Sequence, residues 1–100
     1  MIEVDVQVPS NIKTEELIRL VGQVCTQHDL VCSLKGTLTS YPGCVHWHFK
    51  KEKKTGTLEI TWWEKEGRLW FKVGAHRRAA WIEETIPHLK KQMEAAFSKK

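Results

Sequence analysis

Three consecutive segments in the middle of the chain alternate hydrophobic and polar side chains with a period of two. They are CVHWHFKK at 44–51, TLEITWW at 57–63 and RLWFKV at 68–73. Because successive side chains of a strand point to opposite faces of a sheet, this alternation predicts three antiparallel strands that direct one face into a core. The predicted core face carries Val45, Trp47, Phe49, Leu58, Ile60, Trp62, Leu69, Phe71 and Val73.

The opposite side of these strands, called the second face below, combines imidazole, indole and cationic side chains. It carries Cys44, His46, His48, Lys50, Thr57, Glu59, Thr61, Trp63, Arg68, Trp70 and Lys72. Aromatic side chains gathered on an uncovered surface are typical of interaction sites. We therefore expect the function to reside on this face.

The first part of the chain predicts a strand, a helix and a second strand. Alternation predicts the first strand at 2–8, which ends at Pro9 because proline lacks the N–H needed by a sheet. The helix is expected at 14–28, with Thr14 as its N-cap. The second strand is expected at 30–39. The predicted inward side chains of the helix and this strand are Leu17, Leu20, Val21, Val24, Cys25 and His28, then Cys32, Leu34 and Leu38.

The last element is an amphipathic helix that starts near 77–80 and ends near Phe97. Its apolar residues recur at helical spacing and predict a buried stripe. Pro87 lies well past the first turn, so we expect a kink there or a split at Ile86. The stripe consists of Ile82, Ile86, Leu89, Met93 and Phe97.

The order of elements is β-α-β-β-β-β-α, which predicts an α+β fold. Two amphipathic helices need one apolar sheet face, so the expected architecture is a two-layer sandwich. In it, an antiparallel sheet of about five strands carries both helices on one face. The length of 100 residues predicts a single domain at 1–100. The second face would then be uncovered.

The charge and the cysteines bear on partners and compartment. Residues 1–34 carry two basic and five acidic side chains, whereas residues 35–100 carry fourteen basic and seven acidic ones. A cationic surface fits either an anionic partner or simple solubility. Cys25, Cys32 and Cys44 are odd in number and form no CxxC, which favours reduced core cysteines. The absence of a signal-like or bilayer-length apolar segment predicts a cytoplasmic protein without membrane association.

A metal site is the most specific chemical hypothesis. His46 and His48 are two residues apart on a strand, so their imidazoles project from the same face and could chelate zinc or nickel. Cys44 lies about 13 Å from His48 at Cα, too far to share one ion. The third ligand would be Glu59 on the neighbouring strand or His76. The alternative is a pair of surface histidines that pair with cross-strand neighbours.

Catalysis is not expected, because no catalytic constellation is present. The side chains of Cys44 and His46 lie beside each other with nothing to orient the base. The chain contains no GxGxxG, GxxxxGK[ST] or GxSxG motif. We accordingly expect a binding protein without a cofactor.

Nucleic-acid binding is one alternative, since the second face places aromatic side chains beside cations. Trp63, Trp70, His46 and His48 could stack on bases. Lys72 and the neighbouring pair Arg77 and Arg78 could contact phosphates, together with Lys50, Lys51, Lys53 and Lys54. The lysine run could equally be a solvated loop.

Association with a protein partner, or with a second copy of the chain, is the function that we expect first. Exposed tryptophan and arginine are enriched where interfaces gain most of their affinity. The second face could pack on its twin, or an uncovered edge strand could extend the sheet into a neighbour. The predicted binding residues are His46, His48, Trp63, Trp70, Lys72, Arg77 and Arg78.

The strings GCVHWHFKK, TGTLEITWW, RLWFKV and RRAAWIEETIP resemble small prokaryotic proteins to which no activity is attached, over residues 36 to about 90. The order from the second strand to the last helix also resembles the β-β-β-α part of double-stranded-RNA-binding domains. That family starts its last helix with KKxAK, where this chain has RRAAW. The resemblance therefore concerns topology and transfers no RNA-binding residue.

Overall fold

The computed structural model describes residues 2–98 and has the predicted α+β order, with one five-stranded antiparallel sheet and two helices. Single 3-10 turns at Glu64–Glu66 and Ala75–Arg77 flank the last strand. Within these residues, neither helix is long and apolar enough to cross a membrane. The main elements are β1 (Ile2–Val6), α1 (Thr14–Gln27), β2 (Leu30–Gly36), β3 (Val45–Lys51), β4 (Leu58–Trp63), β5 (Arg68–Val73) and α2 (Ala80–Ser98).

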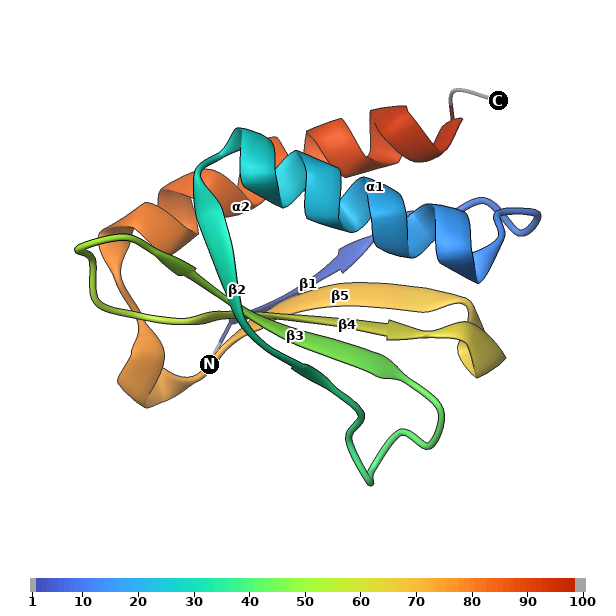
Figure 1. The fold of residues 1–100 in the computed structure, drawn as a ribbon, viewed down its shortest axis with the longest axis horizontal. Coiled ribbons are helices and arrows are strands. Elements are labelled where there is room, and N and C mark those ends of the chain that lie inside the picture. Colours follow the sequence, from blue (N-terminus) through green and yellow to red (C-terminus); the bar gives the residue numbers. More distant parts are fainter. Residues whose placement is uncertain (1, 99–100) are drawn as a thin grey trace.

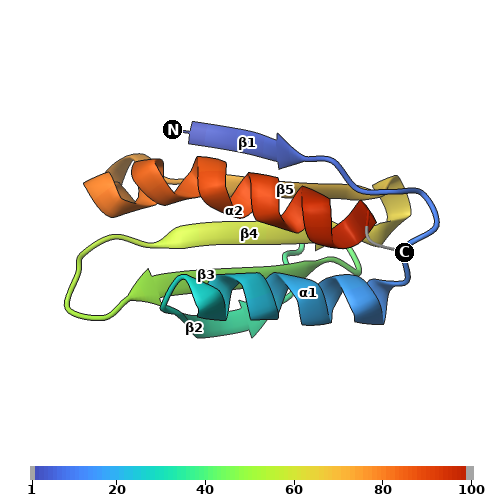
Figure 2. The same ribbon diagram turned by 90° about the horizontal axis from the view of Figure 1, so that it is seen from above.

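The sheet has the strand order β1-β5-β4-β3-β2, so β1 and β2 are its edges. Both helices cover the same side of the sheet (Figure 1). Seen from above, α2 runs over the β1–β5 half and α1 over the β2–β3 half (Figure 2). The expectation of two layers with both helices on one face is confirmed.

The core between the layers is built as the alternation predicted. Every residue of the predicted core face is buried except Val45, which is half-buried, and the whole predicted stripe of α2 is buried. Thr14 is not the N-cap, because the cap position is Lys13. The Thr14 hydroxyl instead accepts a hydrogen bond from Trp62 Nε1 at 3.2 Å, which ties the start of α1 to the sheet.

The inward set predicted for the second strand is wrong for Leu34, and β2 ends at Gly36, before Leu38. A β-bulge between Cys32 and Leu34 shifts the alternation by one residue, so that Leu34 pairs with His48 of the second face. Leu34 is 48% exposed, and Cys32 is exposed rather than a core residue. Val31, on the other side of the bulge, is also exposed. Val31 and Leu34 of this edge strand therefore lie on the side away from the helices, whereas Leu30 belongs to the core.

Pro87 does not split the second helix. α2 runs without interruption from Ala80 to Ser98 with Pro87 inside it. A proline removes the donor for the carbonyl four residues earlier, here that of Glu83. Both Glu83 and Pro87 are exposed, so water can reach that carbonyl.

Candidate metal centre

The second face is not open at its centre, contrary to the expectation from sequence. The β2–β3 connection lies on the side of the sheet opposite the helices (Figure 1), and its Tyr41 ring is 5.1 Å from the Trp70 ring and 5.0 Å from that of Trp63. Arg68 covers the Trp70 ring at 4.2 Å, and Trp63 Nε1 donates to the carbonyl of Pro42. Trp70 is consequently only 2% exposed.

The contacts with the β2–β3 connection give both tryptophans a structural role instead of the predicted binding role. Trp70 has no face left on which a base or a partner side chain could stack, so it is a structural residue of the second face. Trp63 is half-buried and anchors the connection. The sequence signal for this cover is a single aromatic residue, Tyr41, in the segment between β2 and β3.

His46 lies on the second face in the same row of cross-strand partners as Trp70. It is next to the part of this face that the β2–β3 connection covers. It is 4% exposed and faces Thr61 of β4, its cross-strand partner. Its Nδ1 is 2.8 Å from the Thr61 hydroxyl oxygen. With Nδ1 occupied in this way, the ring orientation is fixed and Nε2 is directed at the neighbouring row of the sheet.

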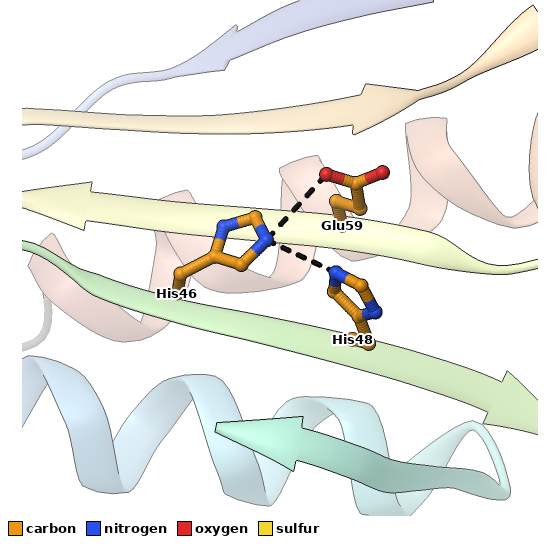
Figure 3. A group of neighbouring side chains, drawn as sticks. All are labelled: His46, His48 and Glu59. Carbon is orange, nitrogen blue, oxygen red and sulfur yellow. Dashed lines mark hydrogen bonds and ion pairs between the residues drawn. The ribbon is translucent and has the colours of Figure 1, made fainter. Parts of the chain in front are cut away.

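That neighbouring row supplies the other two members of the cluster. His48 and Glu59 are cross-strand partners on β3 and β4. His46 Nε2 lies 3.1 Å from His48 Nε2 and 3.5 Å from Glu59 Oε1. Figure 3 shows the two imidazoles and the carboxylate converging from adjacent strands. Three potential ligand atoms thus lie within 4.8 Å of one another.

The two separations measured from His46 match those of ligands that share one metal ion. Zinc binds imidazole nitrogen at about 2.0–2.1 Å, so two nitrogens at a tetrahedral angle are about 3.3 Å apart. The observed 3.1 Å between the two Nε2 atoms and 3.5 Å between His46 and the carboxylate bracket this value. An ion could therefore enter with small side-chain adjustments on a rigid pair of strands.

The electrostatic surroundings keep His46 in the form that binds metal. Burial is the main reason that its pKa is lowered from the usual 6.5. Lys72 and His48 lower this pKa further, while Glu59 acts in the opposite direction. A neutral imidazole has a free lone pair on one nitrogen, which is the form required of a ligand.

Of the other predicted residues, Lys72 and Arg77 lie beside this cluster, and Arg78 does not. Lys72 is the cross-strand partner of Glu59 on β5. Arg77 Nη1 lies 3.8 Å from Glu59 Oε2 and 3.5 Å from His48 Nδ1. Arg78 instead pairs with Glu83 at 3.1 Å.

The structure also separates the candidates for a third ligand. Among the described residues, the cluster of possible metal ligands contains Glu59 and neither His76 nor Cys44. The buried Cys44 thiol accepts a hydrogen bond from the Leu38 N–H at 3.3 Å, so it belongs to the β2–β3 connection.

No protein-family model matches this chain, and neither a curated protein nor a solved structure is significantly similar to it. The topological resemblance to double-stranded-RNA-binding domains stays a prediction. The chemistry of the second face is therefore the basis for a functional assignment.

Proposed function

We propose that this protein binds one divalent first-row transition-metal ion through His46, His48 and Glu59. The observation that carries the proposal is the convergence of two Nε2 atoms and one carboxylate oxygen within 4.8 Å. Two imidazoles and a carboxylate form a ligand set that zinc and ferrous iron accept in proteins. Zinc is the reference ion for the tests.

The surroundings support a site that is more than a pair of surface histidines. Metal-binding histidines ordinarily engage a hydrogen-bond partner through their other nitrogen, as His46 does with Thr61. The second carboxylate oxygen of Glu59 faces Arg77, so both oxygens have a defined direction. Three protein ligands would leave one coordination position for a water or a ligand. The expectation of a non-enzymatic protein stays a prediction.

The direct test is calorimetric titration of zinc into protein that has been treated with a chelator and desalted. One ion per chain is expected. His48→Gln should weaken zinc binding by more than about 100-fold, because losing even an outer partner of a ligand typically costs 10–100-fold. Glu59→Gln should also weaken it.

The matched controls are His76→Gln and His88→Gln, which alter exposed histidines outside the cluster. Both should bind zinc like the original chain. Circular dichroism confirms that each variant is folded. Equal zinc affinity in His48→Gln and the original chain, or no binding at all, would exclude the proposed site.

Association through β2 is a second candidate function, because a specific observation favours it. β2 is an edge strand, and it exposes Val31 by 59% and Leu34 by 48%, the two large hydrophobic side chains most exposed within residues 2–98. An edge strand offers unpaired N–H and C=O groups to a neighbouring strand. We propose that a second copy of the chain pairs with this edge in an antiparallel manner.

Sedimentation equilibrium tests this association. A dimer would have twice the mass of 11.6 kDa, and Leu34→Lys should return it to the monomer. Ala95→Lys places the same charge on an exposed position of α2 and should leave the dimer intact. A monomer at every concentration would exclude this second function and leave the metal site unaffected.

A further inference from the structure

The residues at the rim of the metal cluster indicate what would occupy the remaining coordination position. This inference rests on the proposed metal site. Arg77 is half-exposed, with 49% of its side chain accessible, and its guanidinium lies next to both Glu59 and His48. A guanidinium at the edge of a metal site is suited to hold an oxygen anion, because its planar N–H groups match carboxylate and phosphate oxygens.

Arg77 is held in place through its backbone. Its carbonyl accepts a hydrogen bond from the Thr57 N–H at 3.1 Å, at the entrance to β4 and two residues before Glu59. Gly56 lies so close that an added Cβ would be 3.0 Å from the same carbonyl oxygen. The segment that carries Arg77 is therefore docked on the strand that carries the carboxylate ligand.

Occupation by a metal would release Arg77 from His48. A neutral imidazole that binds a metal through Nε2 carries its proton on Nδ1. In the structure, His48 Nδ1 faces Arg77 Nη1 at 3.5 Å, an arrangement that requires Nδ1 to be the acceptor. With a proton on Nδ1, two donors would face each other. The guanidinium would then turn away from His48 and become available to another acceptor.

The charges at the site favour a negative ligand once the metal is bound. Glu59 is the only carboxylate of the cluster, and it already faces both Arg77 and its strand neighbour Lys72. Glu3, the other cross-strand neighbour of Lys72, is engaged by Arg68 at 3.0 Å. A divalent ion adds two positive charges to this partly buried place, and charges removed from water need compensation.

We propose that the metal-loaded site binds a small oxygen anion, a carboxylate or a phosphate, between the ion and Arg77. The ion would take one anion oxygen at its open position. Arg77 would donate N–H groups to another oxygen, and Lys72 would add positive charge from the adjacent strand. Arg77 is a binding residue for this anion and not a ligand of the metal.

Cobalt makes the test possible, because the visible absorption of protein-bound cobalt changes when a ligand enters its coordination sphere. The full chain is loaded with Co²⁺, and dialysis establishes how much is retained. Acetate and inorganic phosphate are then titrated separately. We expect a saturable change with at least one of them, and the responding anion identifies the carboxylate or the phosphate class.

Arg77→Gln and Arg78→Gln are the decisive pair of variants, because the two arginines are adjacent and only Arg77 faces the cluster. Arg77→Gln should retain Co²⁺ and bind the anion at least about tenfold more weakly, as expected for the loss of a charge-assisted hydrogen bond. Arg78→Gln should behave like the original chain.

Two results would overturn the inference, and they differ from failure of the metal site itself. One is retained Co²⁺ whose spectrum does not respond to either anion. The other is equal anion affinity in Arg77→Gln and the original chain. If the original chain retains no Co²⁺, the proposed function fails and the anion site fails with it.

Discussion

At the scale of single residues, His46 combines burial with a titratable ring. Burial lowers the pKa of His46 from 6.5, so the folded chain binds the proton less readily than the unfolded chain does. Well above this pH both states are neutral and the ring adds no pH dependence. As the pH falls below 6.5, the unfolded state gains the proton first, and the free energy of unfolding must fall.

We predict that His46 makes the metal-free protein less stable at about pH 5 than at about pH 7.5, the range in which histidine titrates. Each unit by which the pKa is lowered corresponds to about 1.4 kcal/mol. Urea unfolding with a chelator present measures the difference. His46→Gln should show a smaller loss between the two pH values, whereas His88→Gln should keep the original one. An unchanged pH profile in His46→Gln would contradict this prediction.

The three cysteines should differ in reactivity, because the structure places them in different surroundings. Burial raises the pKa of Cys25 to about 12, so almost no thiolate is present at neutral pH. Cys44 is buried under the β2–β3 connection, whereas Cys32 is exposed on β2.

We predict that one thiol of the folded chain reacts quickly with iodoacetamide and that it belongs to Cys32. Peptide mass analysis after a short exposure identifies the modified position. The same treatment in urea should modify all three cysteines. Early modification of Cys25 or Cys44 in the folded chain would show that the core opens there. Cys32→Ser should abolish the fast reaction.

At the scale of elements, Gly56 joins the loop before β4 to the segment before α2. It has φ +99°, and an added Cβ would be 2.8 Å from Ala79 Cβ. Gly56→Ala combines an unfavourable backbone with overlap, so we expect a loss of about 1–3 kcal/mol in unfolding free energy.

Gly22 in α1 provides a control of opposite sign. A Cβ added there meets nothing within 4 Å, and alanine suits a helix better than glycine by up to about 1 kcal/mol. Gly22→Ala should therefore stabilise the protein in the same urea assay. A destabilising effect of Gly22→Ala, or a neutral Gly56→Ala, would contradict the packing described for these two positions.

The elements also show what the sequence could predict. β3, β4 and β5 were predictable because each alternates for six or more residues without interruption. In β2, one bulge reversed the alternation, and the residues around Ser33 gave no sequence signal that predicts a bulge. The position of the β2–β3 connection over the second face could not be predicted for a similar reason. It depends on contacts of Tyr41 with residues far along the chain.

The candidate site was partly visible from the same alternation. The spacing of His46 and His48 placed both imidazoles on one face. The alternation of side chains along the next strand placed Glu59 on that face too. Register decided the rest, because only the pairing of β3 with β4 sets Glu59 opposite His48. His76 was an equal candidate in the sequence, and the choice between the two needed the three-dimensional arrangement.

At the scale of the whole molecule, the metal cluster bridges β3 and β4, which are interior strands of the sheet. The three ligands converge only when these strands are paired, so zinc should bind the folded chain and not the unfolded one. Binding to one state alone raises the unfolding free energy, by about 2.7 kcal/mol when free zinc is 100 times the dissociation constant.

For a domain of 100 residues, we predict that this stabilisation raises Tm by on the order of 10 °C. Thermal unfolding with zinc and with a chelator measures the shift, and His48→Gln should show almost none. If zinc binds with one ion per chain but leaves Tm unchanged, its ligands do not depend on the paired strands, and the site must lie elsewhere. A shift that is present in the original chain and in His88→Gln, and absent in His48→Gln, would tie the ion to the centre of the sheet.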